Sequence, residues 1–219
     1  PIPGRCEFGP PFCPCVTDSD GPTMSDLLVC YGTGEGQTAR VADCLAGTLR
    51  DRGHATTLVD LGEGAPERPV ESFDAVLVGA SLHYGRHQRA VRRFVRDERA
   101  TLAARPTGFF QVSLPSASDD PDARAAAAAK VEAFVEQTGW HPDRIGLFGG
   151  ALRYSQYGFL TRLVMKQIAR AQGGETDTSR DHEYTDWAEV AAFADDFAAF
   201  VEGRLGVAPP DGEGETGVP

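Results

Sequence analysis

The sequence predicts a doubly wound α/β fold, in which a five-stranded parallel sheet carries helices on both faces. Short apolar runs alternate with segments of helical periodicity from residue 27 to residue 201, and this alternation is typical of a parallel sheet. A glycine-rich turn at residues 31–38 joins the first apolar run to the first helical segment. Because ligands of such sheets bind beyond the carboxyl ends of the strands, this turn also gives the first indication of function.

The elements follow one another in simple alternation. The expected strands are the apolar or β-branched runs Leu27–Tyr31, His54–Asp60, Ala75–Gly79, Gly108–Ser113 and Ile145–Gly149. The expected helices are Gln37–Arg52, Gln88–Ala103, the alanine run up to Phe134 and Val135, and a last helix that begins near Asp186, with Glu189 placed to cap it. Five strands in this alternation usually take the order 2-1-3-4-5.

The chain is expected to form one folded domain. Residues 1–23 are rich in Pro and Gly and have no positive region followed by an apolar one, so we expect a disordered extension rather than a secretory signal. Residues 24–205 make the predicted domain, with an insertion at 150–185 between the fifth strand and the last helix. Residues 206–219 are expected to form a polar, disordered tail.

Composition excludes several classes of function. A net charge of −11 argues against non-specific nucleic-acid binding, which needs a strong positive field. No apolar stretch approaches the length of a membrane span, so a soluble protein is expected. The five cysteines are interpreted as incidental thiols in a reducing cytoplasm. The cysteines lack the paired spacing of a zinc site, and no metal is predicted.

The turn at residues 31–38 is a candidate phosphate cradle. It has the pattern Thr-x-x-Gly-x-Thr, which places the hydroxyls of Thr33 and Thr38 at its two ends. The dinucleotide fingerprint and the P-loop are weak alternatives, because the third glycine of the fingerprint is replaced by Gln37 and the lysine of a P-loop is missing. Neutral donors at a helix N-terminus would therefore hold the phosphate, and in this the strand, turn and helix resemble those of flavodoxins. A glycine-rich turn without a ligand is the alternative.

Two further loops are expected beside this turn. They follow the third and fourth strands and are expected to flank the planar ring of a flavin. Tyr84 is the candidate for stacking on the ring, the alternative being a tyrosine that packs under its own loop. The predicted cofactor-binding residues are Thr33, Gly34, Glu35, Gly36, Gln37, Thr38, Ser81, Leu82, His83, Tyr84, Gly85, Ser113, Leu114, Pro115 and Ser116.

The insertion contains a predicted basic amphipathic helix at residues 156–172. Apolar side chains recur along one stripe, and Arg162, Lys166 and Arg170 recur every fourth residue beside it. No acidic residue occurs from Gly150 to Gly174, although acids dominate the rest of the chain. Such a helix is typical of a surface that meets anionic lipid or an apolar, anionic ligand. A helix packed on the body of the protein with a solvated basic edge is the alternative.

Four motifs make the resemblance more specific. They are Gly79-Ala-Ser-Leu-His-Tyr-Gly85, Gly149-Gly-Ala-Leu-Arg-Tyr154, Gly173-Gly-Glu-Thr-Asp-Thr178 and Tyr184-Thr-Asp-Trp187. Together they resemble the flavodoxin-type, menaquinone-dependent protoporphyrinogen IX dehydrogenases of haem biosynthesis, the HemG family. The similarity spans about Leu27 to Val201.

The resemblance implies a function and its partners. It implies non-covalent FMN, oxidation of protoporphyrinogen IX to protoporphyrin IX, menaquinone as acceptor, and peripheral contact with the inner face of the cell membrane through the 156–172 helix. No catalytic side chain is predicted, because the flavin N5 would do the chemistry. The predicted substrate-binding residues are Arg86, Arg153, Tyr154 and Arg162.

Two departures from the family pattern leave alternatives open. The position of His83 commonly holds arginine in the family, and the loop Leu114–Asp122 is acidic here, so another porphyrinogen is an alternative substrate. An electron-carrier flavodoxin, an NAD(P)H:quinone reductase and a non-enzymatic scaffold are alternatives of the same fold. The insertion argues against the carrier, which needs an exposed flavin edge and no substrate wall.

Overall fold

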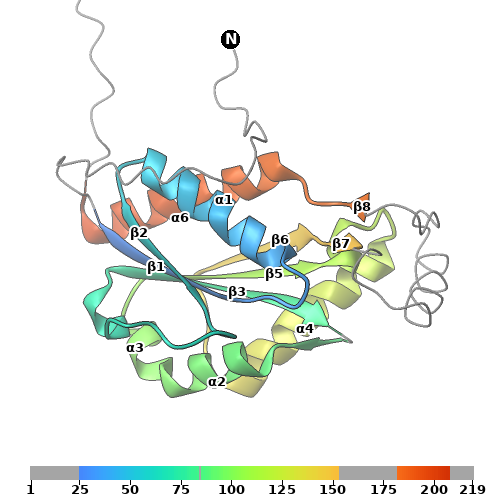
Figure 1. Cartoon of the computed structure of the whole chain (residues 1–219), viewed down its shortest axis with the longest axis horizontal. Coiled ribbons are helices and arrows are strands. Elements are labelled where there is room, and N and C mark those ends of the chain that lie inside the picture. Colours follow the sequence, from blue (N-terminus) through green and yellow to red (C-terminus); the bar gives the residue numbers. More distant parts are fainter. Residues whose placement is uncertain (1–24, 84, 153–181, 208–219) are drawn as a thin grey trace, which may run out of the picture.

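The computed structural model describes residues 25–83, 85–152 and 182–207 (Figure 1). The predicted extension at 1–23, the predicted helix at 156–172 and residues 208–219 of the predicted tail lie outside these ranges. In the described ranges, no helix is long and apolar enough to cross a bilayer.

The centre of the fold is a six-stranded sheet in which five strands are parallel. The parallel strands are β1 (Asp26–Gly32), β2 (Ala55–Asp60), β3 (Ala75–His83), β5 (Thr107–Ser113) and β6 (Arg144–Gly149). Their order is β2-β1-β3-β5-β6, which confirms the predicted order 2-1-3-4-5. The short strand β4 (Arg86–His87) pairs antiparallel with the end of β3.

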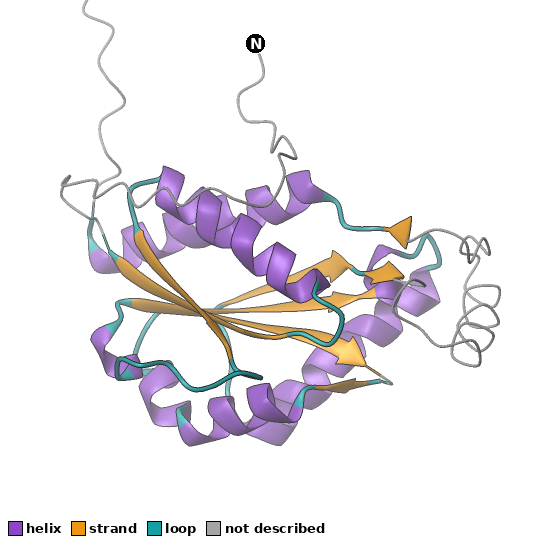
Figure 2. Cartoon of the chain, in the orientation of Figure 1, coloured by secondary structure: helices purple, strands orange, loops and turns teal. Residues whose placement is uncertain are grey.

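Helices cover both faces of the sheet, as Figures 1 and 2 show. One face carries α1 (Gln37–Asp51) and α6 (Trp187–Leu205), and the other carries α2 (Arg89–Asp97), α3 (Arg99–Ala103) and α4 (Pro121–Thr138). Two short 3-10 helices, η1 (Val70–Ser72) and η2 (Leu114–Ala117), precede β3 and α4. The doubly wound architecture predicted from the sequence is therefore confirmed.

Alternation along the strands divides the core into two layers. In β1, Leu27 and Val29 belong to the layer under α1 and α6, while Leu28 and Cys30 belong to the layer under α2 and α4. All four side chains are fully buried. Because successive side chains of a strand point to opposite faces, one continuous apolar run serves both layers.

The start of α6 shows how a local signal sets a boundary. The Asp186 carboxylate accepts hydrogen bonds from the backbone N–H groups of Ala188 (2.9 Å) and Glu189 (3.2 Å). The cap is thus the side chain of Asp186, where the sequence suggested a role for Glu189. Capping of this kind satisfies N–H groups that have no acceptor within the helix.

Two expected boundaries were wrong. The third strand does not end at Gly79: Ser81 still pairs with Val112 of β5, and Leu82 pairs with His87 of β4. The expected helix at residues 88–103 is two helices, because the backbone at Glu98 (φ −96°, ψ 11°) leaves helical values.

The described ends of the insertion also pair with each other. Strands β7 (Ala151–Leu152) and β8 (His182–Glu183) form a small antiparallel sheet, which the sequence did not predict.

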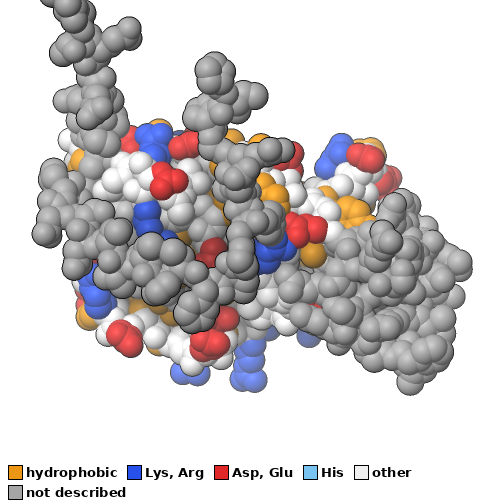
Figure 3. All heavy atoms as spheres, turned by 45° about the horizontal axis from the view of Figure 1, so that its top comes forward, with side chains coloured by type: hydrophobic (Ala, Val, Ile, Leu, Met, Phe, Trp, Pro, Cys, Tyr) orange, Lys and Arg blue, Asp and Glu red, His pale blue; other side chains and the backbone are white. Residues whose placement is uncertain are grey.

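On the face turned forward in Figure 3, the acidic and basic side chains drawn in colour are interspersed. Ion pairs such as Arg52–Glu202 and Arg144–Asp196, both at 2.9 Å, join α6 to the rest of the domain.

Candidate functional site

The candidate site lies at the carboxyl ends of β1, β3 and β5, which meet at one edge of the sheet (Figure 1). The register pairs Gly32 of β1 with Ala80 of β3, and Ser81 of β3 with Val112 of β5. Because these strands are neighbours, the loops that follow them share one surface. The three loops that the sequence predicted as a flavin site are those that follow these strands.

The first loop, residues 33–36, has the geometry of an anion cradle. The backbone N–H of Gly36 donates to Oγ1 of Thr33 at 2.9 Å, and Gly36 takes the left-handed conformation (φ 86°) from which α1 begins. A helix leaves its first N–H groups without intrahelical acceptors, so these donors face the loop. Thr38 is fully buried, yet its Oγ1 has no hydrogen-bond partner among the described residues.

That unpaired hydroxyl is the observation that fits a phosphate. A buried hydroxyl without a partner costs about 1–3 kcal/mol, and an acceptor bound in the cradle would remove that cost. Thr38 Oγ1 lies at the N-terminus of α1, where the helix dipole favours a negative charge. A Cβ atom built on Gly34 would have Ser81 Oγ, at 4.0 Å, as its nearest neighbour, so the loop also leaves room beside β3.

The second predicted loop is a hairpin rather than an irregular segment. The strand β3 runs to His83 and turns back into β4 through Gly85, which has a positive φ of 73°. Tyr84, the predicted stacking residue, lies outside the described residues. Ser81 accepts a hydrogen bond from the side-chain amide of Gln88, the residue before α2. Gln88 is a site residue that sequence reasoning missed, although it directly follows the predicted loop.

The third loop is η2, which follows β5. The hydroxyls of Ser113 and Ser116 are hydrogen-bonded to each other at 2.7 Å. The carbonyl of Ser113 accepts from the backbone N–H of Gly150 at 3.1 Å, so the end of β6 holds this loop in place. Leu114, Pro115 and Ser116 are half-buried. The hydroxyls of Ser113 and Ser116 are small polar groups that suit one edge of a flavin ring.

A buried polar chain beneath the site was also missed from the sequence. His87 lies with its Nε2 2.8 Å from Oε1 of Gln111, and Nε2 of Gln111 donates to the carbonyl of Ala127 at 3.2 Å. Burial lowers the pKa of His87, and the charges of Arg92 and Lys130 lower it further, against the opposing effect of the Gln111 hydrogen bond. The position of Gln111 inside the otherwise apolar strand β5 was the signal available in the sequence.

The start of α1 is joined to residues that come after the insertion. Nε2 of Gln37 donates to Oγ1 of Thr185 at 2.8 Å, and that hydroxyl donates to the carbonyl of Gly149 at 2.7 Å. Arg40 forms an ion pair with Glu183. The side chain of Gln37, predicted to bind the cofactor, therefore makes contacts within the protein, and its backbone remains part of the cradle.

The structure brings together part of the predicted site. It places Thr33, Gly34, Gly36, Thr38 and Ser81 at adjacent positions. Of the predicted substrate-binding residues, Arg86 is exposed on β4 beside the hairpin turn. The other three, Arg153, Tyr154 and Arg162, lie outside the described residues.

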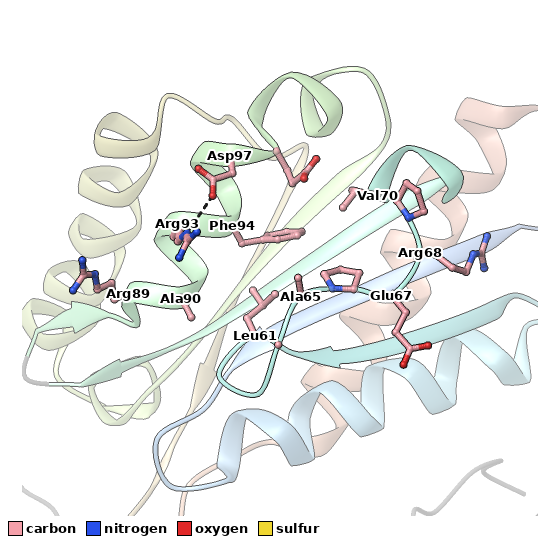
Figure 4. A pocket seen from close by; sticks show the side chains of 14 residues that line it. Leu61, Ala65, Glu67, Arg68, Val70, Arg89, Ala90, Arg93, Phe94 and Asp97 are labelled. Carbon is pink, nitrogen blue, oxygen red and sulfur yellow. Dashed lines mark hydrogen bonds and ion pairs between the residues drawn. The ribbon is translucent and has the colours of Figure 1, made fainter.

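A groove of about 840 Å³ lies elsewhere on the molecule, between residues 61–70 and α2 (Figure 4). Leu61, Val70 and Phe94 contribute apolar side chains, and Arg89 and Arg93 contribute charge. No predicted cofactor-binding residue lines this groove. It is therefore separate from the candidate site.

Comparisons with known proteins identify relatives of the chain. Residues 28–179 match the family model described as Flavodoxin domain. The chain is 35% identical over 173 residues to "Protoporphyrinogen IX dehydrogenase [quinone]" of Leishmania major, covering 78% of this chain and 74% of that protein. It is 34% identical over 172 residues to the protein of the same name from Escherichia coli K12, covering 78% and 93%. Oxidised flavodoxin 1 from Bacillus cereus aligns at 13% identity, covering 80% and 98%, with a TM-score of 0.47.

Proposed function

The chain belongs to the flavodoxin-domain family of quinone-dependent protoporphyrinogen IX dehydrogenases, and from this membership we propose that it binds FMN and oxidises protoporphyrinogen IX to protoporphyrin IX. It is therefore proposed as a flavin-dependent oxidoreductase of haem biosynthesis that passes electrons to a quinone. The structural observation that carries the proposal is the buried, unpaired Thr38 hydroxyl within the Thr-x-x-Gly-x-Thr loop.

The residues around this hydroxyl fit the phosphate of FMN. Thr38 Oγ1 would donate to a phosphate oxygen, and the N–H groups at the start of α1 would supply neutral donors beside it. Gly34 leaves the space for the group to approach the backbone. The hydrogen bond between Thr33 and Gly36 holds the loop curled around this space. A cradle of this kind needs no lysine or arginine.

The other two loops would orient the flavin ring. Ser81 is held by Gln88 and Ser113 is held by Ser116, so the polar groups that would face the two ring edges are fixed in direction. When bound, FMN supplies two-electron redox chemistry, so that three cycles account for the six electrons removed from the porphyrinogen. The chain's own residues bind, orient and shield the flavin, and no side chain is assigned a proton-transfer step.

The substrate side of the proposal rests on charge. Protoporphyrinogen carries two propionate groups, and guanidinium groups bind carboxylates in bidentate fashion. Arg86 is exposed next to the β3–β4 hairpin, where a substrate above the flavin would lie. We assign Arg86, together with Arg153, Tyr154 and Arg162 of the insertion, to substrate binding.

The acceptor and the membrane contact extend the proposal further. We propose menaquinone as the quinone, which the resemblance in the four sequence motifs supports. We also propose that residues 156–172 contact the inner, anionic face of the cell membrane, because the sequence from Gly150 to Gly174 contains basic residues and no acidic ones. The catalytic domain is assigned to residues 24–205, with 150–185 as the substrate-facing insertion.

An anaerobic experiment tests the proposed reaction in two halves. The protein is loaded with FMN, protoporphyrinogen IX is added, and flavin absorbance is followed before and after addition of a menaquinone analogue. Bleaching by porphyrinogen followed by recovery with the quinone is the expected result. Bleaching by NADPH without bleaching by porphyrinogen would instead establish a quinone reductase.

A further inference from the structure

The Tyr184-Thr-Asp-Trp187 motif has no role in the reaction proposed above, but its neighbours in the structure suggest one. Thr185 accepts a hydrogen bond from Nε2 of Gln37 at 2.8 Å and donates to the carbonyl of Gly149 at 2.7 Å. Gln37 is the first residue of α1 and directly follows the phosphate loop; its residue exposure is only 5%. One hydroxyl thus joins the start of α1 to the end of β6.

A second connection runs beside the first. Nη1 of Arg40 donates to Oε1 of Gln37 at 3.2 Å and forms an ion pair with Glu183. The other carboxylate oxygen of Glu183 accepts from the indole N–H of Trp187 at 2.8 Å, and the Arg40 guanidinium lies 5.2 Å from the centre of the Trp187 ring. We call the five residues Gln37, Arg40, Glu183, Thr185 and Trp187 the clamp.

The clamp continues to the third loop of the site. The N–H of Tyr184 donates to the carbonyl of Gly150 at 3.0 Å, and the N–H of Gly150 donates to the carbonyl of Ser113 at 3.1 Å. A Cβ atom built on Gly149 would lie 2.1 Å from the Tyr184 carbonyl oxygen and 2.7 Å from Cβ of Ala117 in η2. Backbone hydrogen bonds and close packing therefore extend from the clamp to the loop that would hold a flavin ring edge.

We propose that the clamp sets the spacing between the loop at residues 33–36 and η2, so that Thr185 is a positioning residue for FMN. This inference rests on the proposed function, because it concerns the FMN site. Thr185 acts through Gln37 and Gly149: without its hydroxyl, the buried amide of Gln37 and the carbonyl of Gly149 each lose a partner. The two loops then lose a fixed spacing, and FMN binding has to restore it.

Within the clamp, Thr185 should contribute more than the ion pair. The side chains of Arg40 and Glu183 are 30% and 32% exposed, and pairs with such access to water contribute little to stability. The Thr185 hydroxyl makes both of its hydrogen bonds in partly buried surroundings. A change confined to this hydroxyl is consequently the most direct test.

The test measures FMN binding to the apoprotein by quenching of flavin fluorescence. Thr185→Val removes the hydroxyl at nearly constant volume, and we expect the Kd for FMN to rise about fivefold to tenfold, as for the loss of roughly one hydrogen bond. Thr185→Ser keeps the hydroxyl and should bind as the parent does. Arg144→Ala, which breaks an exposed ion pair between β6 and α6 outside the clamp, is the matched control and should leave the Kd unchanged.

A double-mutant cycle with Gln37→Leu separates the clamp from a general loss of structure. The double variant should lose less affinity than the product of the two single losses, because both changes break the same hydrogen bond. Three results would each overturn the inference. Thr185→Val could bind FMN as tightly as the parent, or Thr185→Val and Arg144→Ala could lose equal affinity for FMN. In the double-mutant cycle, the two losses of affinity could be fully multiplicative.

The same titrations keep the inference distinct from the proposed function. If the parent binds FMN and the anaerobic reaction proceeds while Thr185→Val binds normally, the positioning role fails and the function stands. If the parent binds FMN and Thr185→Val binds it more weakly, but porphyrinogen does not bleach the flavin, the positioning role stands and the substrate assignment fails. A parent that does not bind FMN would overturn both.

Discussion

The imidazole of His87 donates a hydrogen bond from Nε2 to the side-chain carbonyl of Gln111 at 2.8 Å, within the apolar layer beneath the candidate site. The direction follows from the amide nitrogen of Gln111, which donates to the carbonyl of Ala127 and so turns its oxygen toward the imidazole. The rings of Phe109 and Phe134 meet the imidazole edge-on at centroid distances of 5.6 and 4.9 Å. The hydrogen bond and the two aromatic rings thereby fix the orientation of the buried His87 imidazole.

This arrangement predicts a loss of stability in mild acid. Burial, with the charges of Arg92 and Lys130, lowers the pKa of folded His87 below the ordinary value of 6.5. Below about pH 6.5 the unfolded chain therefore takes up a proton that the folded chain does not. The free energy of unfolding consequently decreases as the pH decreases, until the pH passes the pKa of His87 in the folded protein. His54, whose pKa burial also lowers, acts in the same direction.

Urea unfolding at pH 7.5 and pH 5.5 measures the effect. The parent should lose stability between the two, and His87→Gln should lose less, whatever its stability at pH 7.5. The exposed residue His141 supplies the control, since His141→Gln should keep the parental difference. An unchanged difference in His87→Gln would show that His87 is not responsible.

Two glycines should respond in opposite directions to alanine. A methyl group at Gly149 would collide with backbone, the Tyr184 carbonyl oxygen at 2.1 Å, so Gly149→Ala should lower the free energy of unfolding by about 2–3 kcal/mol. Gly203 lies inside α6 with nothing within 4 Å of a built Cβ, and Gly203→Ala should raise it by about 0.5–1 kcal/mol. Urea denaturation of both variants and the parent measures these changes. An unchanged free energy of unfolding in Gly149→Ala would mean that β6 and Tyr184 can move apart at little cost in free energy.

The five parallel strands and the helices that cover them were predictable because each carries a local pattern. In β1 a four-residue apolar run already specifies a strand buried on both faces, and Gly36 marks the point at which α1 begins. The end of β3 was misjudged for the same reason. Ser81-Leu-His83 looks like a loop in isolation, whereas pairing of Ser81 with Val112 and of Leu82 with His87 extends the strand. Strand pairing is a tertiary effect that overrides local propensity.

The site was predictable where backbone and short motifs define it and not where distant side chains meet. The loop around Thr33 and Thr38 stands out in the sequence because its pattern is contiguous. The contact between Gln37 and Thr185 joins residues 148 positions apart, and neither residue carries a local signal for the other. The Tyr184-Thr-Asp-Trp187 motif was noticeable in the sequence, but its contact with α1 emerges only in three dimensions.

Membrane contact predicts a salt-sensitive association with anionic vesicles. Each basic residue near an anionic surface contributes about 1 kcal/mol, so the triple variant R162E/K166E/R170E should no longer sediment with vesicles that bind the parent. The matched control is R89E/R93E/R96E on α2, which makes the same change in net charge at exposed positions. Equal losses in both variants would attribute the binding to overall charge, and no loss in the first would remove residues 156–172 from the membrane contact.

The Thr38 hydroxyl offers the sharpest test of the phosphate cradle, because it has no other partner in the described residues. Thr38→Val should raise the Kd for FMN about 10- to 100-fold, as for a hydrogen bond to a charged group. It should leave the apoprotein as stable as the parent or slightly more so, since the hydroxyl is buried unpaired. Riboflavin, which lacks the phosphate, should bind the variant and the parent alike. Thr48→Val in the same helix, whose hydroxyl donates to the Cys44 carbonyl, is the matched control and should bind FMN normally. Equal weakening of FMN and riboflavin in Thr38→Val would place the phosphate elsewhere, because a cradle contact must discriminate between the two flavins.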